Sequence, residues 1–116
     1  MQLSRIKEIL GARVLVEASG RADPEIKAAG GSDLMSDVLA FAKPGMLLLT
    51  GLTNEQSIRT AEIADIYVVC YVRGKQPTDQ AIELAKKKNI TILTTDMKLY
   101  EACGQLYAAG LPPIVD

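Results

Sequence analysis

Histidine is absent from the 116-residue sequence, and cysteine occurs twice. Because histidine is the commonest general base and metal ligand near neutral pH, its absence excludes a hydrolase triad that uses histidine. Cys70 and Cys103 both lie in apolar patterns, so we interpret them as small buried residues in a reducing cytosol rather than as a disulfide or metal pair. No nucleophile in the sequence has an evident base. We therefore predict no catalytic residue, no metal site and no cofactor.

The sequence also lacks a strong charge of either sign, since its formal net charge is −1 at pH 7. Affinity for DNA or RNA rests on neutralising phosphates, so this balance argues against nucleic-acid binding. The basic run at residues 86–88 lies at the end of a predicted helix, where cations complement the helix dipole. No apolar run approaches the roughly 20 residues of a membrane span, and the first ten residues do not resemble a signal peptide. We expect a cytoplasmic protein that binds neither nucleic acid nor a membrane.

The named phosphate-binding motifs are missing as well. Neither GxxxxGKS/T nor GxGxxG after a strand occurs in the sequence. Glu17, Asp23 and Glu25 are close in sequence, but charged residues around a proline turn are usually exposed to solvent. A small enzyme is therefore the least favoured function class.

The sequence does contain a regular alternation of apolar runs and amphipathic segments. Its length and its 48% of apolar residues suit one globular domain spanning residues 1–116. Near the N-terminus, the spacing of apolar residues predicts a short helix with Ser4 as its N-cap and Gly11 at its end. A strand over residues 13–17 follows. The chain is therefore expected to start with a short helix followed by a strand.

The part that follows is irregular up to residue 33, whereas the part from residue 46 onward is regular. Residues 19–33 contain many turn residues, with one short extended piece at Ile26 and Ala28, and Ser32 or Asp33 is the expected N-cap of a helix over about residues 34–42. The apolar tail LPPIVD is incompatible with a helix, so we expect it to pack on a sheet edge or on a partner chain. The regular part predicts strands over residues 46–50, 66–72 and 90–94, and helices over residues 54–64, 79–88 and 97–109.

These strands are continuous apolar runs, which is typical of strands covered on both faces. The helices between them are amphipathic; the last one has its apolar face over Leu99, Ala102, Cys103, Leu106 and Tyr107. Alternating strands and helices of this length predict parallel strands with right-handed crossovers. The expected fold class is therefore α/β, a three-layer, mostly parallel sheet with helices on both faces.

In an open parallel sheet, ligands bind beyond the carboxyl ends of the strands. Three predicted turns lie there, and small, hydroxyl and basic side chains with free backbone N–H groups can together hold a phosphate or carboxylate. The candidate ligand-binding residues in these turns are Thr50, Gly51, Thr53, Asn54, Arg73, Lys75, Thr94, Thr95 and Asp96.

Each turn also has a purely structural explanation. Thr53 and Gln56 fit a capping box at the start of a helix, which needs no ligand. Thr78 and Asp96 are ordinary N-cap candidates for the two later helices. Capping is the commoner role for any one of these segments, whereas the convergence of all three favours a ligand site.

The order of elements resembles the DRTGG domain family over about residues 26–106. The matching stretches are GGSDLMSDVLAFAKPGMLLLTG, ADIYVVCYVRGKQPTDQAIELAKKKNITILTTD and YEACGQL. The resemblance implies a fold similar to the N-terminal domain of HPr kinase, and a regulatory or ligand-sensing module without chemistry of its own that often self-associates. It also implies the stand-alone form of the domain. Family members tend to carry an Asp-Arg pair in the turn that here reads Gly51-Leu52-Thr53-Asn54, so the most specific residues of that turn are absent.

Two functional hypotheses follow. The first is a non-catalytic cytoplasmic regulatory domain that binds a small anionic ligand, such as a nucleotide or a phosphorylated metabolite, or a protein partner, and forms a homodimer. The second is a pure interaction or scaffold module that acts as a homodimer. Because the charged pair is missing from the first turn, ligand contacts are expected mainly from Arg73, Lys75 and the segment Thr94–Asp96.

Overall fold

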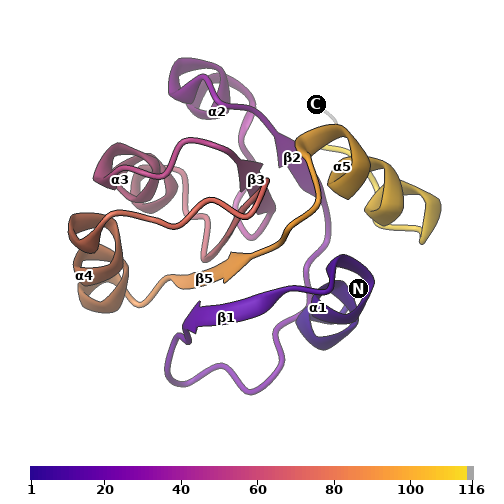
Figure 1. Cartoon of the computed structure of the whole chain (residues 1–116), viewed down its shortest axis with the longest axis horizontal. Coiled ribbons are helices and arrows are strands. Elements are labelled where there is room, and N and C mark those ends of the chain that lie inside the picture. Colours follow the sequence, from indigo (N-terminus) through magenta and orange to yellow (C-terminus); the bar gives the residue numbers. More distant parts are fainter. Residues whose placement is uncertain (115–116) are drawn as a thin grey trace.

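The computed structural model describes residues 1–114 and contains one five-stranded sheet with five helices (Figure 1). The strands have the spatial order β1-β5-β4-β3-β2. The four strands β2 to β5 are parallel, and β1 pairs with β5 in the antiparallel direction. The elements are α1 (Leu3–Leu10), β1 (Arg13–Val16), β2 (Ala29–Gly31), α2 (Met35–Phe41), β3 (Leu47–Thr50), α3 (Glu55–Ile63), β4 (Val68–Tyr71), α4 (Asp79–Lys88), β5 (Thr91–Thr94) and α5 (Leu99–Ala108).

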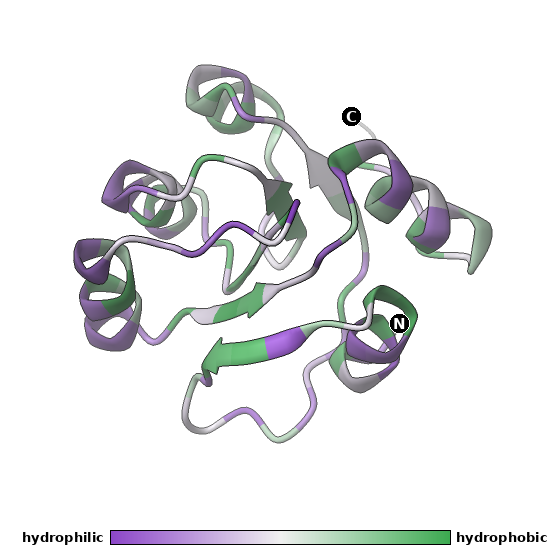
Figure 2. Cartoon of the chain, viewed as in Figure 1, coloured by the Kyte–Doolittle hydropathy of each residue, from purple (hydrophilic) through white to green (hydrophobic). Residues whose placement is uncertain are grey.

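Helices cover both faces of this sheet. One core packs α2, α3 and α4 against the sheet, and the other packs α1 and α5 against the opposite face, as Figure 1 also shows. Every residue of β3, β4 and β5 is buried, because alternate side chains enter the two cores. Figure 2 shows the outer sides of α3 and α4 as hydrophilic. The predicted three-layer, mostly parallel α/β class is confirmed.

The helix starts differ from the prediction at several turns. At the start of α3, Asn54 is the N-cap and its side chain accepts the Gln56 N–H, so the Thr53/Gln56 capping box is wrong. Leu34 is the N-cap of α2 and has no side-chain cap bond, so neither Ser32 nor Asp33 has that role. Helix α5 begins at Leu99 rather than near Asp96. The prediction for Thr78 is confirmed, since its hydroxyl accepts the N–H of Ala81.

The start of α1 is held by a side chain from a distant loop. Ser4 is not the N-cap; instead, its N–H and its hydroxyl donate to the two carboxylate oxygens of Asp23, at 2.9 and 2.7 Å. These hydrogen bonds, led by the one from the hydroxyl, lower the pKa of Asp23. An anion at the positive end of a helix is favourable, so Asp23 ties the irregular loop to α1.

This contact predicts a pH-dependent contribution to stability. The folded-state pKa of Asp23 lies below its unfolded value of 3.8, so its contribution is fully present above that value and is lost as the pH falls through the folded pKa. Replacing Asp23 with asparagine should therefore lower the melting temperature at neutral pH, and the gap from the wild type should narrow below about pH 4. Thermal denaturation followed by circular dichroism at several pH values measures this gap. A gap that stays constant through the acid range contradicts the prediction.

The tail packs on the sheet edge, as one of the two alternatives predicted. Leu111 is buried, the Ala29 N–H donates to the Pro112 carbonyl at 3.2 Å, and Pro113 forms a parallel bridge with Ala29. The last two residues of LPPIVD lie outside the described range. The tail therefore extends the sheet beyond β2.

Candidate functional site

The three predicted turns meet at the carboxyl ends of β3, β4 and β5. The Thr78 N–H donates to the Thr53 carbonyl at 3.0 Å, which joins the β3–α3 turn to the β4–α4 turn. The Gly74 N–H donates to the Thr95 carbonyl at 2.9 Å, which joins the β4–α4 turn to the segment after β5. The parallel strand order places these turns side by side, so the sequence-based expectation that they converge is met.

Asp33, which was expected to cap the next helix, contacts the first of these turns. The Gly51 N–H donates to Oδ1 of Asp33 at 2.6 Å, and the Thr50 hydroxyl donates to the same oxygen at 3.3 Å. Asp33 comes from the segment between β2 and α2, and β2 is the parallel neighbour of β3. The backbone N–H that was expected to hold a ligand anion therefore holds a carboxylate of the chain itself.

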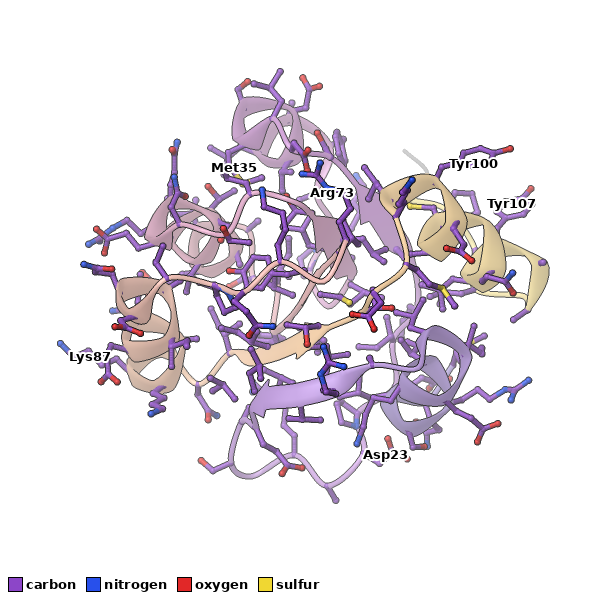
Figure 3. The ribbon with its side chains drawn as sticks, viewed as in Figure 1. Asp23, Met35, Arg73, Lys87, Tyr100 and Tyr107 are labelled. Atoms are coloured by element: carbon purple, nitrogen blue, oxygen red, sulfur yellow. The ribbon has the colours of Figure 1, made fainter. Side chains whose placement is uncertain are left out.

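The Arg73 guanidinium also approaches Gly51. A Cβ atom built on Gly51 would be 2.8 Å from Nη2 of Arg73, and 3.3 and 3.4 Å from the Asp33 carboxylate oxygens. Arg73 has a positive φ of 63°, which is uncommon for a residue with a side chain. In Figure 3, the labelled Arg73 side chain is drawn between α2 and β2. The absence of a side chain at Gly51 is what lets these charged groups approach the turn.

Further charged side chains surround these turns. Nζ of Lys75 donates to the Gly51 carbonyl at 2.7 Å. Arg13, at the start of the antiparallel strand β1, lies 3.5 Å from Asp96 in an exposed ion pair. The edge thus presents three basic side chains, from Arg13, Arg73 and Lys75, beside the carboxylates of Asp33 and Asp96. Arg13 was not among the predicted residues, because an antiparallel strand brings its first residue, not its last, to this edge.

Three of the predicted threonines lie in the interior of the fold rather than on its surface. Thr50, Thr94 and Thr95 are buried. The Thr95 hydroxyl donates to the Leu10 carbonyl at 2.6 Å and accepts the Met97 N–H. The Thr94 hydroxyl is a buried polar atom without a hydrogen-bond partner among the described residues. Asn54, Arg73, Lys75 and Asp96 are exposed, so they are the predicted residues whose side chains are accessible to a ligand, although the Asn54 side chain also caps α3.

The titratable groups under this edge are buried and protonated. Burial raises the pKa of Tyr71 to about 12 and that of Cys70 to about 12. The Ser57 hydroxyl donates to the Asn54 carbonyl at 2.7 Å, so the Tyr71 hydroxyl donates the 2.7 Å bond between Tyr71 and Ser57. Both groups are neutral near pH 7, and the Tyr71–Ser57 bond ties β4 to the start of α3. Within residues 1–114, no cluster of acidic, cysteine or histidine side chains could hold a metal ion, and no helix is long and apolar enough to cross a membrane.

Comparison with known proteins gives a match in structure. No family model matches the sequence, and none of the curated proteins compared with it does. The fold is similar to the crystal structure of the CBS and DRTGG domains of the regulatory region of Clostridium perfringens pyrophosphatase, complexed with the activator diadenosine tetraphosphate. The TM-score is 0.75 at 22% identity, and the match covers 95% of this chain and 47% of that chain. This chain therefore spans about half the length of that structure. The likeness establishes the fold and is consistent with the DRTGG-like character drawn from the sequence.

Proposed function

We propose that this chain is a regulatory domain, spanning residues 1–116, that binds a small anionic ligand of the nucleotide class at the carboxyl edge of its sheet. The observation that carries the proposal is the position of Arg73 and Lys75. Both side chains are exposed, and both approach the Gly51 turn from the neighbouring β4–α4 turn. Basic side chains beside backbone N–H groups are a common way to hold phosphate oxygens.

The fold comparison supports this proposal in two ways. The similar structure belongs to the regulatory region of a pyrophosphatase, and its activator, diadenosine tetraphosphate, carries a phosphate chain. A nucleotide ligand and a regulatory role are therefore natural expectations for a chain with the same fold. A non-catalytic role also agrees with the chemistry under the edge, since Cys70 and Tyr71 are buried and their pKa values are raised far above neutrality.

The test is a titration of the chain with ATP and with diadenosine tetraphosphate, followed by calorimetry. Replacing Arg73 with glutamine should weaken binding at least tenfold, because charge-assisted hydrogen bonds to phosphate contribute about 1.5 to 3 kcal/mol. Arg59 on α3 is the matched control, since it is exposed and pairs with Glu55. Arg59→Gln makes the same change in net charge and should alter the affinity less than about twofold, because exposed charges at a distance are screened by salt.

Two results would overturn the proposal. One is the absence of binding of either nucleotide at millimolar concentration. The other is an equal loss of affinity in Arg73→Gln and Arg59→Gln, which would indicate a general effect of net charge rather than a site at this edge.

Protein interaction is a second candidate function, favoured by exposed apolar side chains just before α2 and on α5. Leu34 is 58% exposed, and Tyr100 and Tyr107 on α5 are 92% and 69% exposed (Figure 3). Tyr107 was expected on the packed face of its helix, and it instead borders a groove of about 200 Å³ beside Gly31 and Cys103. Tyrosine is enriched at protein–protein interfaces relative to the rest of the protein surface. The homodimer implied by the family resemblance stays a prediction.

A further inference from the structure

The carboxylate of Asp33 occupies the place where a ligand oxyanion would bind. It accepts hydrogen bonds from the Gly51 N–H and the Thr50 hydroxyl, and it shares the space over Gly51 with the Arg73 guanidinium. A backbone N–H, a hydroxyl and a guanidinium are donors that proteins use for phosphate and carboxylate oxygens alike. The turn therefore already binds an anion, and that anion belongs to the chain.

Asp33 is not needed to start the neighbouring helix. The N-cap of α2 is Leu34, and the Leu34 N–H donates a hydrogen bond to the Ser32 hydroxyl at 3.0 Å. Asp33 is exposed and lies between β2 and α2. If its side chain left the turn, the hydrogen bonds from Gly51 and Thr50 would be lost. The hydrogen bond between Leu34 and Ser32 at the start of α2 would remain.

We propose that Asp33 is an autoinhibitory competitor, which a phosphate group of the ligand displaces from the Gly51 turn. This inference rests on the proposed function of the same edge. A bound phosphate oxygen takes the Gly51 N–H and the Thr50 hydroxyl, and it meets the Arg73 guanidinium that lies over Gly51. Asp33 thus raises the ligand concentration at which the domain responds.

The competition also selects the class of ligand. A tethered carboxylate competes at an effective concentration of about millimolar or more. A free monocarboxylate offers the same charge and the same number of oxygens, so it gains nothing by replacing Asp33. A phosphate chain carries more charge and more acceptor oxygens, and Lys75 is bound to the carbonyl of the same glycine, within reach of a second phosphate. The geometry therefore points to a polyphosphate ligand, either inorganic or attached to a nucleoside.

The decisive variant is Asp33→Asn, which removes the charge and keeps an oxygen that can accept the Gly51 N–H. Its matched control is Asp37→Asn, which makes the same change in net charge in the first turn of α2. Calorimetric titration with sodium triphosphate should give an affinity at least tenfold higher for Asp33→Asn than for the wild type. The affinity of Asp37→Asn should lie within about threefold of the wild type, because an exposed charge outside the turn is screened. Adding Arg73→Gln to Asp33→Asn should abolish the gain.

Each outcome has a distinct meaning. Equal affinities of the wild type and Asp33→Asn overturn the autoinhibitory role and leave the proposed function standing. Absence of triphosphate and ATP binding in both proteins overturns the two proposals together. Acetate that competes as well as triphosphate overturns the assigned ligand class. A parallel titration with ATP separates the sources, since a higher affinity for ATP than for triphosphate shows that the nucleoside also contacts the domain.

A second measurement uses the unaltered chain and does not depend on how Asp33→Asn folds. Because phosphate replaces the carboxylate at the Gly51 N–H, the amide signal of Gly51 in a proton–nitrogen correlation spectrum should shift on addition of triphosphate. The amide signal of Gly104, which lies on α5, should not shift. An unchanged Gly51 signal at saturating triphosphate overturns the displacement.

Discussion

Replacing Gly31 with alanine is expected to destabilise the fold by about 1 to 3 kcal/mol, the range for an extra methyl group in a packed contact. The new Cβ would lie 2.8 Å from Sγ of Cys103 and 3.0 Å from Cδ1 of Leu99, and both residues are on α5. Gly31 does not have a positive φ, so the backbone accepts alanine and the contact with α5 decides the result. For a domain of this size, each kcal/mol corresponds to a fall in melting temperature of about 4 to 8 °C.

Two variants make this prediction specific. Gly104→Ala is the control, since none of the described residues outside its own stretch of helix backbone lies within 4 Å of its Cβ position on α5, and alanine should stabilise the helix by about 0.5 to 1 kcal/mol. Cys103→Ala in the Gly31→Ala background removes the closest atom and should recover part of the lost stability. Thermal denaturation measures all three. A melting temperature of Gly31→Ala equal to or above that of the wild type would show that α5 does not constrain β2.

The fold was predictable because its strongest signals are local. Continuous apolar runs such as Leu47–Thr50 and Val68–Tyr71 are buried on both faces, and such runs indicate central parallel strands without knowledge of their neighbours. Element ends were less predictable. At α3, both Thr53 and Asn54 are good N-cap residues, and the choice of Asn54 shortens the helix by one residue. The contact that holds the start of α1 could not be predicted, because Asp23 is 19 residues away from Ser4 along the chain.

The site was predictable only in outline. The three turns converge because parallel strands end at one edge, and that follows from the order of elements. Asp33 and Arg13 were missed because each reaches the edge through strand pairing, of β2 with β3 and of β1 with β5. One signal for Asp33 was available, since an acidic residue soon after the strand parallel to Leu47–Thr50 would end near its Thr-Gly turn.

The structure also changes the meaning of the missing charged pair in the first turn. The turn at Gly51 contains neither aspartate nor arginine, yet the side chains of Asp33 and Arg73 both approach Gly51. One charge comes from the segment after β2 and the other from the segment after β4. Charged side chains therefore do lie beside this turn, and they come from the segments that follow the neighbouring strands.

Replacing Gly51 with alanine should therefore affect binding far more than stability. The new Cβ would lie 2.8 Å from Nη2 of Arg73 and 3.3 Å from Oδ1 of Asp33, and both atoms are ends of flexible side chains that can move away. Gly51 does not have a positive φ, so alanine should not strain the backbone. The melting temperature should therefore fall by no more than the amount that corresponds to a loss of about 1 kcal/mol of stability. The affinity for ATP should fall at least tenfold, since the methyl group fills the space over the Gly51 N–H where a phosphate oxygen would meet Arg73.

Gly31 and Gly51 are expected to differ in role, since Gly31 is needed for packing and Gly51 for ligand binding. Alanine at Gly31 should lower stability, because helix α5 has to shift to make room for the methyl group. Alanine at Gly51 should lower affinity instead, because there exposed side chains move aside. Calorimetry with ATP and thermal denaturation of both variants test the contrast, with Gly104→Ala as the common control because its Cβ position meets no other part of the described chain. If Gly51→Ala binds ATP as the wild type does, the ligand does not use the space between Asp33 and Arg73, and the nucleotide site must lie away from the Gly51 turn.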